Sequence, residues 1–414
     1  MTSLHTPHHH TGRNTRLLAG LAVTALAALV IGCGGGGSDT AATTGSSTAP
    51  TVAATGYTQG TVSGFGSVVV NGVRFDDSSA TVTDDAGTKT AASAGSLKLG
   101  MCVEVDHSAV DSSTTSATAA AFRYGSLVLG PVSAVNAAAS TITVLGQVVD
   151  VGSATVFDDA LAAGLSAVTV GALVEVHGLL NSATGHITAT RIESETAATA
   201  YKLRGTVAAL DTAAKTFSIN GTLISYSGLV STLVPTTLAN GSTLRVLLAT
   251  AQVNGQWVAQ SLGIKATTKP ADNTAAQLRG SISAFTSATS FTVGGLVVDA
   301  TNASFPDGST GLALGVQLEV QGTVRNGVLV ATKVSLESKH RGDDSHALQL
   351  IGAITALDST AKTFVVRGVT VSRSSATVYV NGVEADLAVG RKVHVKGTLG
   401  STRSQVLASQ ISFD

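Results

Sequence analysis

One short block of residues recurs five times along the 414-residue chain. Each copy begins with a glycine, continues with Thr, Pro, Ser or Ala, and then has Val or Ile; the openings are Gly60-Thr61-Val62, Gly130-Pro131-Val132, Gly205-Thr206-Val207, Gly280-Ser281-Ile282 and Gly352-Ala353-Ile354. Successive openings are 70, 75, 75 and 72 residues apart. Self-similarity at a nearly fixed period is typical of repeat architectures. The chain therefore predicts an array of small domains rather than one large enzyme.

Each unit carries the pattern of a β-hairpin shortly after its opening. A strand-like run ends in a glycine, and a second apolar run follows; the first runs are residues 68–72, 142–146, 217–221, 291–295 and 364–368. Glycine, alone or after asparagine, supplies the positive φ values that tight hairpin turns require. We therefore expect a hairpin at the same place in every unit.

A second glycine precedes a short alternating strand in every unit. These glycines are Gly100, Gly171, Gly241, Gly315 and Gly390. Apolar and polar residues alternate after them, which predicts strands with one buried face. We expect the apolar set to be buried, namely Val103, Val105, Val174, Val176, Leu318, Val320, Val393 and Val395. We expect the residues between them to be substantially exposed, namely Glu104, Glu175, Glu319 and His394.

The order of these pieces predicts the fold class. Each unit has five or six short strands and at most one helical turn before the fourth strand, and a small sheet protects its edges by closing on itself. We therefore expect an all-β chain with a tandem array of five small OB-like β-barrel units; a small sandwich is the alternative. The five separable units are predicted at residues 57–126, 127–198, 199–268, 275–338 and 347–414.

The N-terminal segment predicts the cellular address. Arg13 and Arg16 precede an uncharged apolar run at residues 17–31, which suits a signal peptide spanning residues 1–32. Gly32-Cys33 resembles a bacterial lipobox, so Cys33 is the expected lipidation site; an ordinary cleaved signal is the alternative. Residues 33–56 are rich in Gly, Ser, Thr and Ala and predict a flexible tether. Because Gly34 follows the cysteine, we expect a lipid-anchored protein of the cell envelope at the outer membrane, on its periplasmic or surface face.

The charge balance argues against nucleic-acid partners. The full chain has a net charge of −1, and removal of residues 1–32 with Arg13 and Arg16 would bring it to −3. Phosphate binding depends on clustered positive charge. The expected partners are therefore the membrane, through the N-terminal lipid, and an envelope glycan or protein.

Four aspartates form the strongest candidate for a calcium site. Asp84-Asp85 and Asp158-Asp159 both follow the third strand of their units, and paired loop carboxylates supply oxygen ligands for calcium. Asp at such turn positions also forms Asx turns with its own backbone, which is the interpretation we favour. The sequence therefore predicts no metal site and no cofactor, with these aspartates as weak candidates.

Other reactive residue types also lack a catalytic pattern. Cys102 has no fixed histidine partner and occupies a slot that holds lysine, Lys392, in the fifth unit. His177 and His186 flank one predicted hairpin and with Glu175 could hold a metal, but zinc sites usually have tighter spacing and more ligands. We therefore expect solvent-facing strand histidines, no catalytic residues and no enzyme; the binding residues stay unassigned.

The repeat is similar to a known family. The run 60–75 of the first unit, together with Leu99-Gly100 and residues 103–105, resembles an uncharacterised repeat domain of proteobacterial lipoproteins. The resemblance extends over all five units and is weakest in the third. It implies the location and the fold but brings no reaction. We expect a non-catalytic binding, adhesive or structural spacer module; the alternative is an accessory subunit or hydrolase acting on envelope polymers, with a site between repeats.

Overall fold

The structure is a computed structural model, and it describes residues 55–91, 95–264, 269–337, 347–401 and 403–414. The predicted signal peptide 1–32, the lipidation site Cys33 and nearly all of the predicted tether lie outside these residues. The described part of the chain consists of β-strands with a few single 3-10 turns, and none of its helices is long and apolar enough to cross a membrane. The prediction of an all-β chain is therefore confirmed.

The first stretch of the chain forms a closed ring of five strands. They are β1 (Gly56–Phe65), β2 (Val68–Val70), β3 (Val73–Asp76), β6 (Cys102–His107) and β7 (Ser116–Tyr124), with β4 (Thr81–Thr83) and β5 (Lys89–Ala91) as additions. β1, β2 and β3 pair in antiparallel order, β3 pairs in parallel with β7, and β6 joins β7 back to β1. The ladders therefore close the sheet on itself and leave the ring without a free edge.

The second stretch repeats this ring and contains the candidate site described below. Its strands are β8 (Val128–Asn136), β9 (Thr141–Val144), β10 (Gln147–Phe157), β11 (Leu173–Leu180) and β12 (Ile187–Glu195). β10 and β12 form the parallel pair, and β11 joins β12 to β8. Two short 3-10 turns, η1 (Asp159–Leu161) and η2 (Gly164–Ala167), precede β11, where the sequence predicts a single helical turn.

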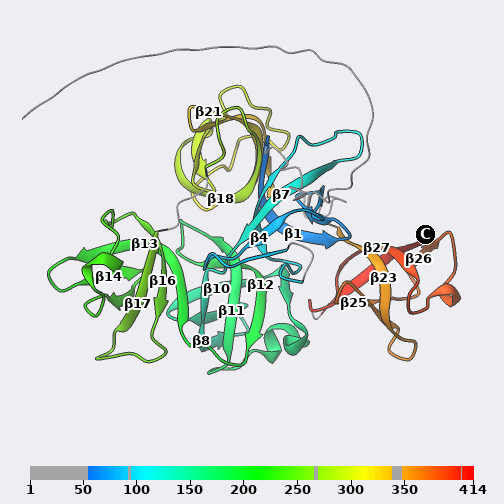
Figure 1. The fold of residues 1–414 in the computed structure, drawn as a ribbon, viewed down its shortest axis with the longest axis horizontal. Helices are drawn as coiled ribbons and strands as arrows, with labels where there is room; N and C mark the ends of the chain where they lie inside the picture. The colour runs from blue at the N-terminus through cyan, green and yellow to red at the C-terminus, as the bar shows by residue number, and fades with distance from the viewer. Residues whose placement is uncertain (1–54, 92–94, 265–268, 338–346, 402) are drawn as a thin grey trace, which may run out of the picture. The chain divides into compact units, whose positions relative to one another are not determined.

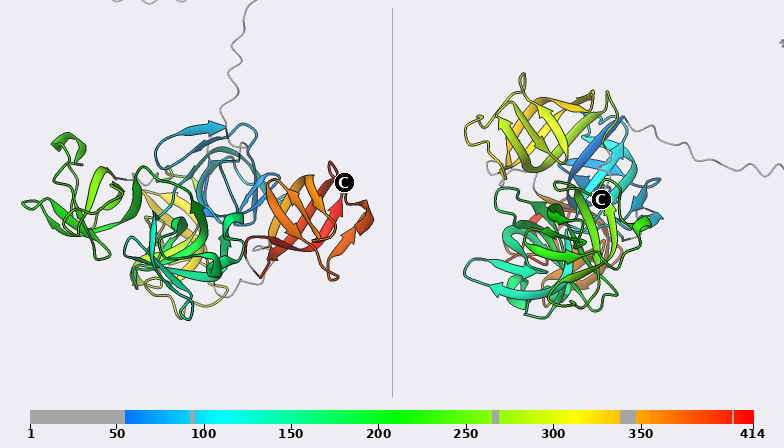
Figure 2. Two further views of the ribbon diagram at one scale, coloured as in Figure 1. Left: turned by 90° about the horizontal axis from the view of Figure 1, so that it is seen from below. Right: turned by 90° about the vertical axis from the view of Figure 1, so that its left-hand side faces the viewer.

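Three further stretches have the same pairing order. The third comprises β13 (Tyr201–Asp211), β14 (Thr216–Ile219), β15 (Thr222–Ser225), η3 (Ser231–Leu233), β16 (Thr243–Leu248) and β17 (Trp257–Ile264). The fourth comprises β18 (Ala275–Ser287), β19 (Ser290–Val293), β20 (Leu296–Asp299), β21 (Gln317–Arg325) and β22 (Val328–Leu336). The fifth comprises β23 (Leu348–Asp358), β24 (Thr363–Val366), β25 (Val369–Ser372), β26 (Val378–Val380), η6 (Glu384–Asp386), β27 (Lys392–Leu399) and β28 (Val406–Phe413). Figures 1 and 2 show the stretches as small rolled sheets, coloured in chain order.

Two glycines recur in every stretch for different physical reasons. The one before the fourth strand, such as Gly171, has a φ of 87° and donates its N–H to the carbonyl of Val132 on the first strand. The opening glycine, such as Gly130, lies so close to the Leu145 side chain that a Cβ would collide with it. The glycine before the fourth strand therefore supplies a backbone conformation that L-residues rarely adopt. The opening glycine supplies room for a neighbouring side chain where the strands cross.

The predicted buried face is confirmed and the predicted exposed face is not. All eight apolar residues of the alternating strands are buried, together with fully buried aromatics such as Phe122 and Phe217. The residues between them were expected to be exposed, but Glu104 is buried, and Glu175, Glu319 and His394 are half-buried. The exposure prediction is wrong because arginine and lysine side chains pair with the glutamates.

Backbone ladders also connect different stretches. β1 pairs in parallel with β18 of the fourth stretch and with β23 of the fifth, and β8 pairs with β13 of the third. The alternation of each strand says which face is buried, but it does not say which edge finds a partner. Hydrogen bonds between strands therefore connect the first stretch to the fourth and fifth, and the second to the third.

Candidate functional site

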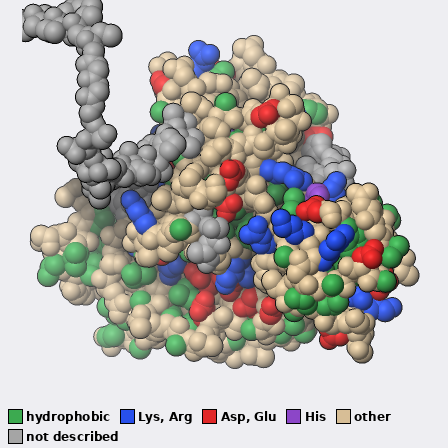
Figure 3. Space-filling model, turned by 45° about the vertical axis from the view of Figure 1, so that its right-hand side comes forward, with side chains coloured by type: hydrophobic (Ala, Val, Ile, Leu, Met, Phe, Trp, Pro, Cys, Tyr) green, Lys and Arg blue, Asp and Glu red, His purple; other side chains and the backbone are tan. Residues whose placement is uncertain are grey.

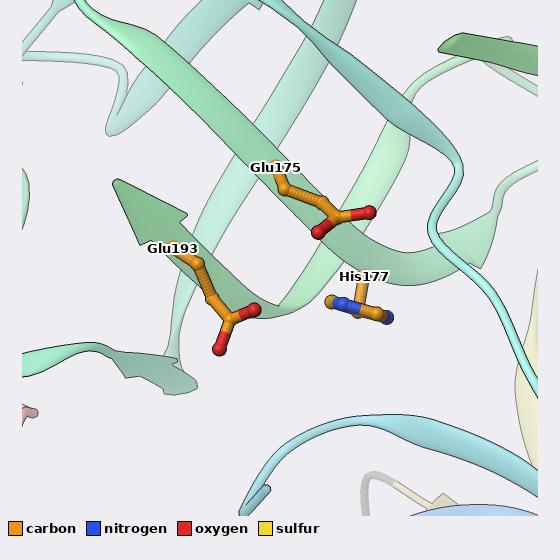
Figure 4. Close-up of side chains that lie close together, drawn as sticks. All are labelled: Glu175, His177 and Glu193. Carbon is orange, nitrogen blue, oxygen red and sulfur yellow. The ribbon is translucent and has the colours of Figure 1, made fainter. Parts of the chain in front are cut away.

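Three ionisable side chains of the second stretch converge on one outer face of its ring (Figure 4). Glu175 and His177 are two residues apart on β11 and so lie on the same face of the strand. Glu193 lies directly opposite Glu175 in the β11–β12 ladder. One ligand atom from each of the three side chains lies within 4.8 Å of the other two.

His177 is the unusual member of this cluster. Its side chain is 1% exposed, and neither Nδ1 nor Nε2 has a hydrogen-bond partner among the described residues. Burial lowers the pKa of the imidazole, and it outweighs the opposing effect of Glu175 and Glu193. The ring is therefore neutral at neutral pH and has an unprotonated nitrogen available as a ligand.

Cations balance the two carboxylates. Arg191 Nε lies 2.6 Å from Glu193 Oε1, and Lys98 Nζ lies 2.9 Å from the same oxygen. Lys202 Nζ lies 3.1 Å from Glu175 Oε1. Burial opposes ionisation of both glutamates, but these cations hold their pKa values below the usual range. Both side chains are therefore carboxylates at neutral pH.

On the equivalent outer faces of the first and fourth stretches, glutamate or aspartate side chains pair with arginine. In the first stretch Arg123 lies opposite Glu104 and donates two hydrogen bonds to Asp106, of 2.7 and 2.9 Å. In the fourth stretch Arg279 lies 3.3 Å from Glu319. Acidic and basic side chains also lie next to each other on the face of the molecule shown in Figure 3. The charges on these faces therefore serve first to compensate one another.

The four weak calcium candidates have structural contacts. Asp84 Oδ1 accepts hydrogen bonds from the backbone N–H groups of residues 86 and 88, which is the predicted turn. Asp158 caps η1 through the N–H of Leu161 at 3.0 Å and also accepts from the N–H of Ser194 at 2.8 Å. Asp159 is the exposed first residue of η1. The turn interpretation therefore fits Asp84 and Asp158.

Asp85 has a different role. Its Oδ1 lies 3.3 Å from Lys202 Nζ and 3.7 Å from Arg245 Nη1, and both cations belong to the third stretch. An aspartate of the first stretch thus forms ion pairs between stretches rather than closing its own loop. The turn interpretation does not account for these contacts, because pairing between stretches is a tertiary property.

The structure separates the two histidines that the sequence analysis considered as metal ligands. Glu175 and His177 do lie together, whereas His186 Nδ1 lies 3.0 Å from Asp150 and pairs with it instead. The prediction of a solvent-facing strand histidine is wrong for His177, because it is buried. Sequence reasoning missed Glu193. The only hint in the sequence is that Glu193 alternates with Arg191 on the closing strand, which places both on one face. The register of β11 against β12 places Glu193 opposite Glu175.

The thiol of Cys102 forms contacts with the second stretch. It is within hydrogen-bonding reach of Thr190 Oγ1 at 3.4 Å and of the Gly178 carbonyl at 3.6 Å, both in the second stretch. Burial raises the pKa of this thiol, so the reactive thiolate is disfavoured at neutral pH.

Comparison with known proteins identifies the repeat. Residues 58–119, 130–193, 279–335 and 351–412 match the family described as a domain of unknown function, DUF5666. The third stretch is not among the matched segments, so the prediction of five copies of this family is wrong. The third stretch keeps the strand order but departs in sequence, for example where Leu244-Arg245-Val246 replaces the apolar–Glu–apolar pattern.

Other comparisons add little. No curated protein is similar enough to the chain to count as a relative. Among solved structures, a chain titled "drosophila Unr CSD456" is 14% identical over 53% of this chain and 98% of its own length, with a TM-score of 0.13, which is too low to establish a shared fold.

The four DUF5666 segments together span more than half of the sequence, and the protein therefore belongs to the DUF5666 family, with four tandem copies of its domain.

Proposed function

We propose that the protein is a lipid-anchored module of the cell envelope, a non-catalytic structural spacer that holds its barrels as one connected array and presents their outer surfaces to an envelope glycan or protein. The lipid on Cys33 attaches it to the outer membrane, and residues 33–56 tether the array. The address rests on the sequence, through the apolar run 17–31 and the cysteine that follows it.

The observation that carries the spacer role is the bonding between stretches. β1 shares parallel ladders with β18 and β23, and β8 shares an antiparallel ladder with β13. Backbone ladders resist bending and separation more than flexible linkers do. An array joined in this way would keep a bound partner at a fixed distance from its anchor, which is what a spacer requires.

We further propose that the barrels are of the OB type and that the third stretch is a diverged copy. The pairing order of first, second, third, fifth and fourth strand, with the third and fifth parallel, supports this assignment. The third stretch has the same order, including the parallel pair of β15 with β17. OB-type barrels commonly bind linear polymers on one face.

The alternative is an accessory subunit or hydrolase with a site between repeats. The cluster of Glu175, His177 and Glu193 is the observation that favours it, because Lys98 of the first stretch and Lys202 of the third both reach its carboxylates. A paired-carboxylate hydrolase needs one carboxyl group with a raised pKa as its general acid, whereas cations lower the pKa of both Glu175 and Glu193, so we place the spacer first.

Small-angle X-ray scattering on residues 34–414, produced without the signal peptide and therefore without the lipid, tests the spacer. A fixed array gives one scattering curve that a single arrangement of barrels fits, and it does not change with salt. A curve that only an ensemble of freely jointed barrels can fit would overturn the proposal. A pull-down with envelope glycans and peptides on the same protein identifies the partner, and hydrolysis of those glycans would favour the alternative.

A further inference from the structure

We propose that Glu175, His177 and Glu193 form a binding site for a divalent transition-metal cation, with Zn²⁺ as the probe. This site goes beyond the spacer function and does not depend on it. It also departs from the expectation, drawn from the sequence alone, that the chain has no metal site.

The geometry and the ligand types fit such an ion. Imidazole nitrogen and carboxylate oxygen are both zinc ligands, and three protein ligands leave the fourth position to a water. In tetrahedral geometry, ligand atoms bound to one zinc at about 2.0–2.2 Å lie about 3.3–3.6 Å from one another. The three side chains already have ligand atoms within 4.8 Å of one another, so side-chain rotations that move these atoms by about 1 Å would complete the site.

The second, independent observation is the unpartnered imidazole. A buried polar group usually has a hydrogen-bond partner, and leaving it without one is unfavourable. His177 is 1% exposed with both ring nitrogens unpartnered, and its ring lies beside the two carboxylates in Figure 4. A metal ion in the cluster would satisfy one nitrogen and would be bound by both carboxylates.

The neighbouring cations leave room for the ion but weaken its binding. The ion pairs of Lys98, Arg191 and Lys202 all end on the Oε1 atoms of the glutamates. We assign the Oε2 atoms as the metal ligands. Since the three cations repel a metal ion, its affinity rises when one of them is removed.

The other stretches provide an internal contrast. Arg123 stands opposite Glu104 in the first stretch, where the second has Glu193 opposite Glu175. In the fourth stretch Glu319 faces Ser335, which offers only a hydroxyl. A carboxylate pair across this ladder, next to a histidine, is therefore a feature of the second stretch among these three.

The test uses the full chain with His5, His8, His9 and His10 replaced by Gln, because these four N-terminal histidines would bind metal on their own. Zn²⁺ and Co²⁺ are titrated by calorimetry, and the visible absorption of Co²⁺ reports the ligand set. We expect one equivalent bound, with at least about tenfold weaker binding in Glu175→Gln, Glu193→Gln and His177→Ala, since even outer partners of a metal site are worth that much.

Two matched variants make the test decisive. Glu319→Gln removes the equivalent glutamate of the fourth stretch and should leave the affinity unchanged. Lys98→Met removes a half-exposed cation beside Glu193 and should tighten binding about threefold or more. Circular dichroism verifies that each variant is folded. The proposal is overturned when the parent chain does not bind Zn²⁺, or when Glu175→Gln and Glu319→Gln bind it equally well.

Discussion

Lys202 at the start of β13 forms an ion pair with Glu175 of β11, with 3.1 Å between Nζ and Oε1. The same ammonium group lies 3.3 Å from Asp85 of the first stretch and donates a hydrogen bond of 2.9 Å to Ser126. One lysine of the third stretch thus joins side chains of the first and second. Its side chain is only 14% exposed, so little water screens these contacts.

Lys202→Met should therefore destabilise the chain. The change leaves Glu175 without its lysine and removes one of the two cations of Asp85, and unpairing a largely buried carboxylate costs about 1–3 kcal/mol. Urea unfolding, followed by circular dichroism, measures the loss. Lys392→Met replaces an exposed lysine and is the control, with an expected change within about 0.5 kcal/mol. Equal effects of the two variants would contradict the role of Lys202.

Gly130→Ala should destabilise the second barrel. A Cβ at this position collides with the Leu145 side chain, and overpacking a buried contact costs about 1–3 kcal/mol. Gly152→Ala is the matched control, because a Cβ there meets nothing within 4 Å and the backbone is outside the positive-φ region. The midpoint of urea unfolding should fall for Gly130→Ala alone, and a fall of the same size in the control would show that the crossing of the strands is not the cause.

Stability should decrease as the pH falls below about 6.5, the usual pKa of histidine. Burial holds the pKa of His177 below that value in the folded state, with Glu175 and Glu193 raising it and Arg191 and Lys202 lowering it further. The unfolded chain then binds more protons than the folded one, so the free energy of unfolding rises with pH, by up to about 1.4 kcal/mol per unit for each such histidine.

The measurement is urea unfolding at pH 7.0 and 5.5 for the wild type and His177→Gln. The glutamine cannot gain a proton, so the variant should lose part of the pH dependence. Burial also lowers the pKa of His107 and His394, and these histidines account for the part that remains. An unchanged pH dependence in His177→Gln would contradict the assignment.

Cys33→Ala should abolish lipid attachment. The thiol is the only group at the end of the apolar run that can form a thioether to a diacylglycerol, and several acyl chains on one residue anchor a protein stably. Labelling of cells with radioactive palmitate and the shift in gel mobility measure the modification. Lipid labelling of Cys33→Ala, or its absence from the wild type, would refute the lipid anchor and with it the proposed envelope address.

Much of each barrel could be predicted from local patterns in the sequence. The burial of Val174 and Val176 could be predicted, because alternation along a strand assigns its two faces without knowledge of the partner strand. The glycine before the fourth strand recurs because the turn there needs a positive φ, as at Gly171. Asp84 and Asp158 form the local contacts that short-range side-chain chemistry predicts.

The candidate site, in contrast, was determined only in the tertiary structure. Glu175 and His177 share a strand face in the sequence, but Glu193 joins them through the register of β11 against β12, and Lys202 reaches them from another stretch. The ladders from β1 to β18 and β23 join residues more than 200 positions apart. The sequence by itself thus determined the repeat, the strand faces and the turns, because these depend on neighbours along the chain. The tertiary structure decided which charged faces meet, because pairing of strand edges and burial of ions depend on contacts between residues distant in sequence.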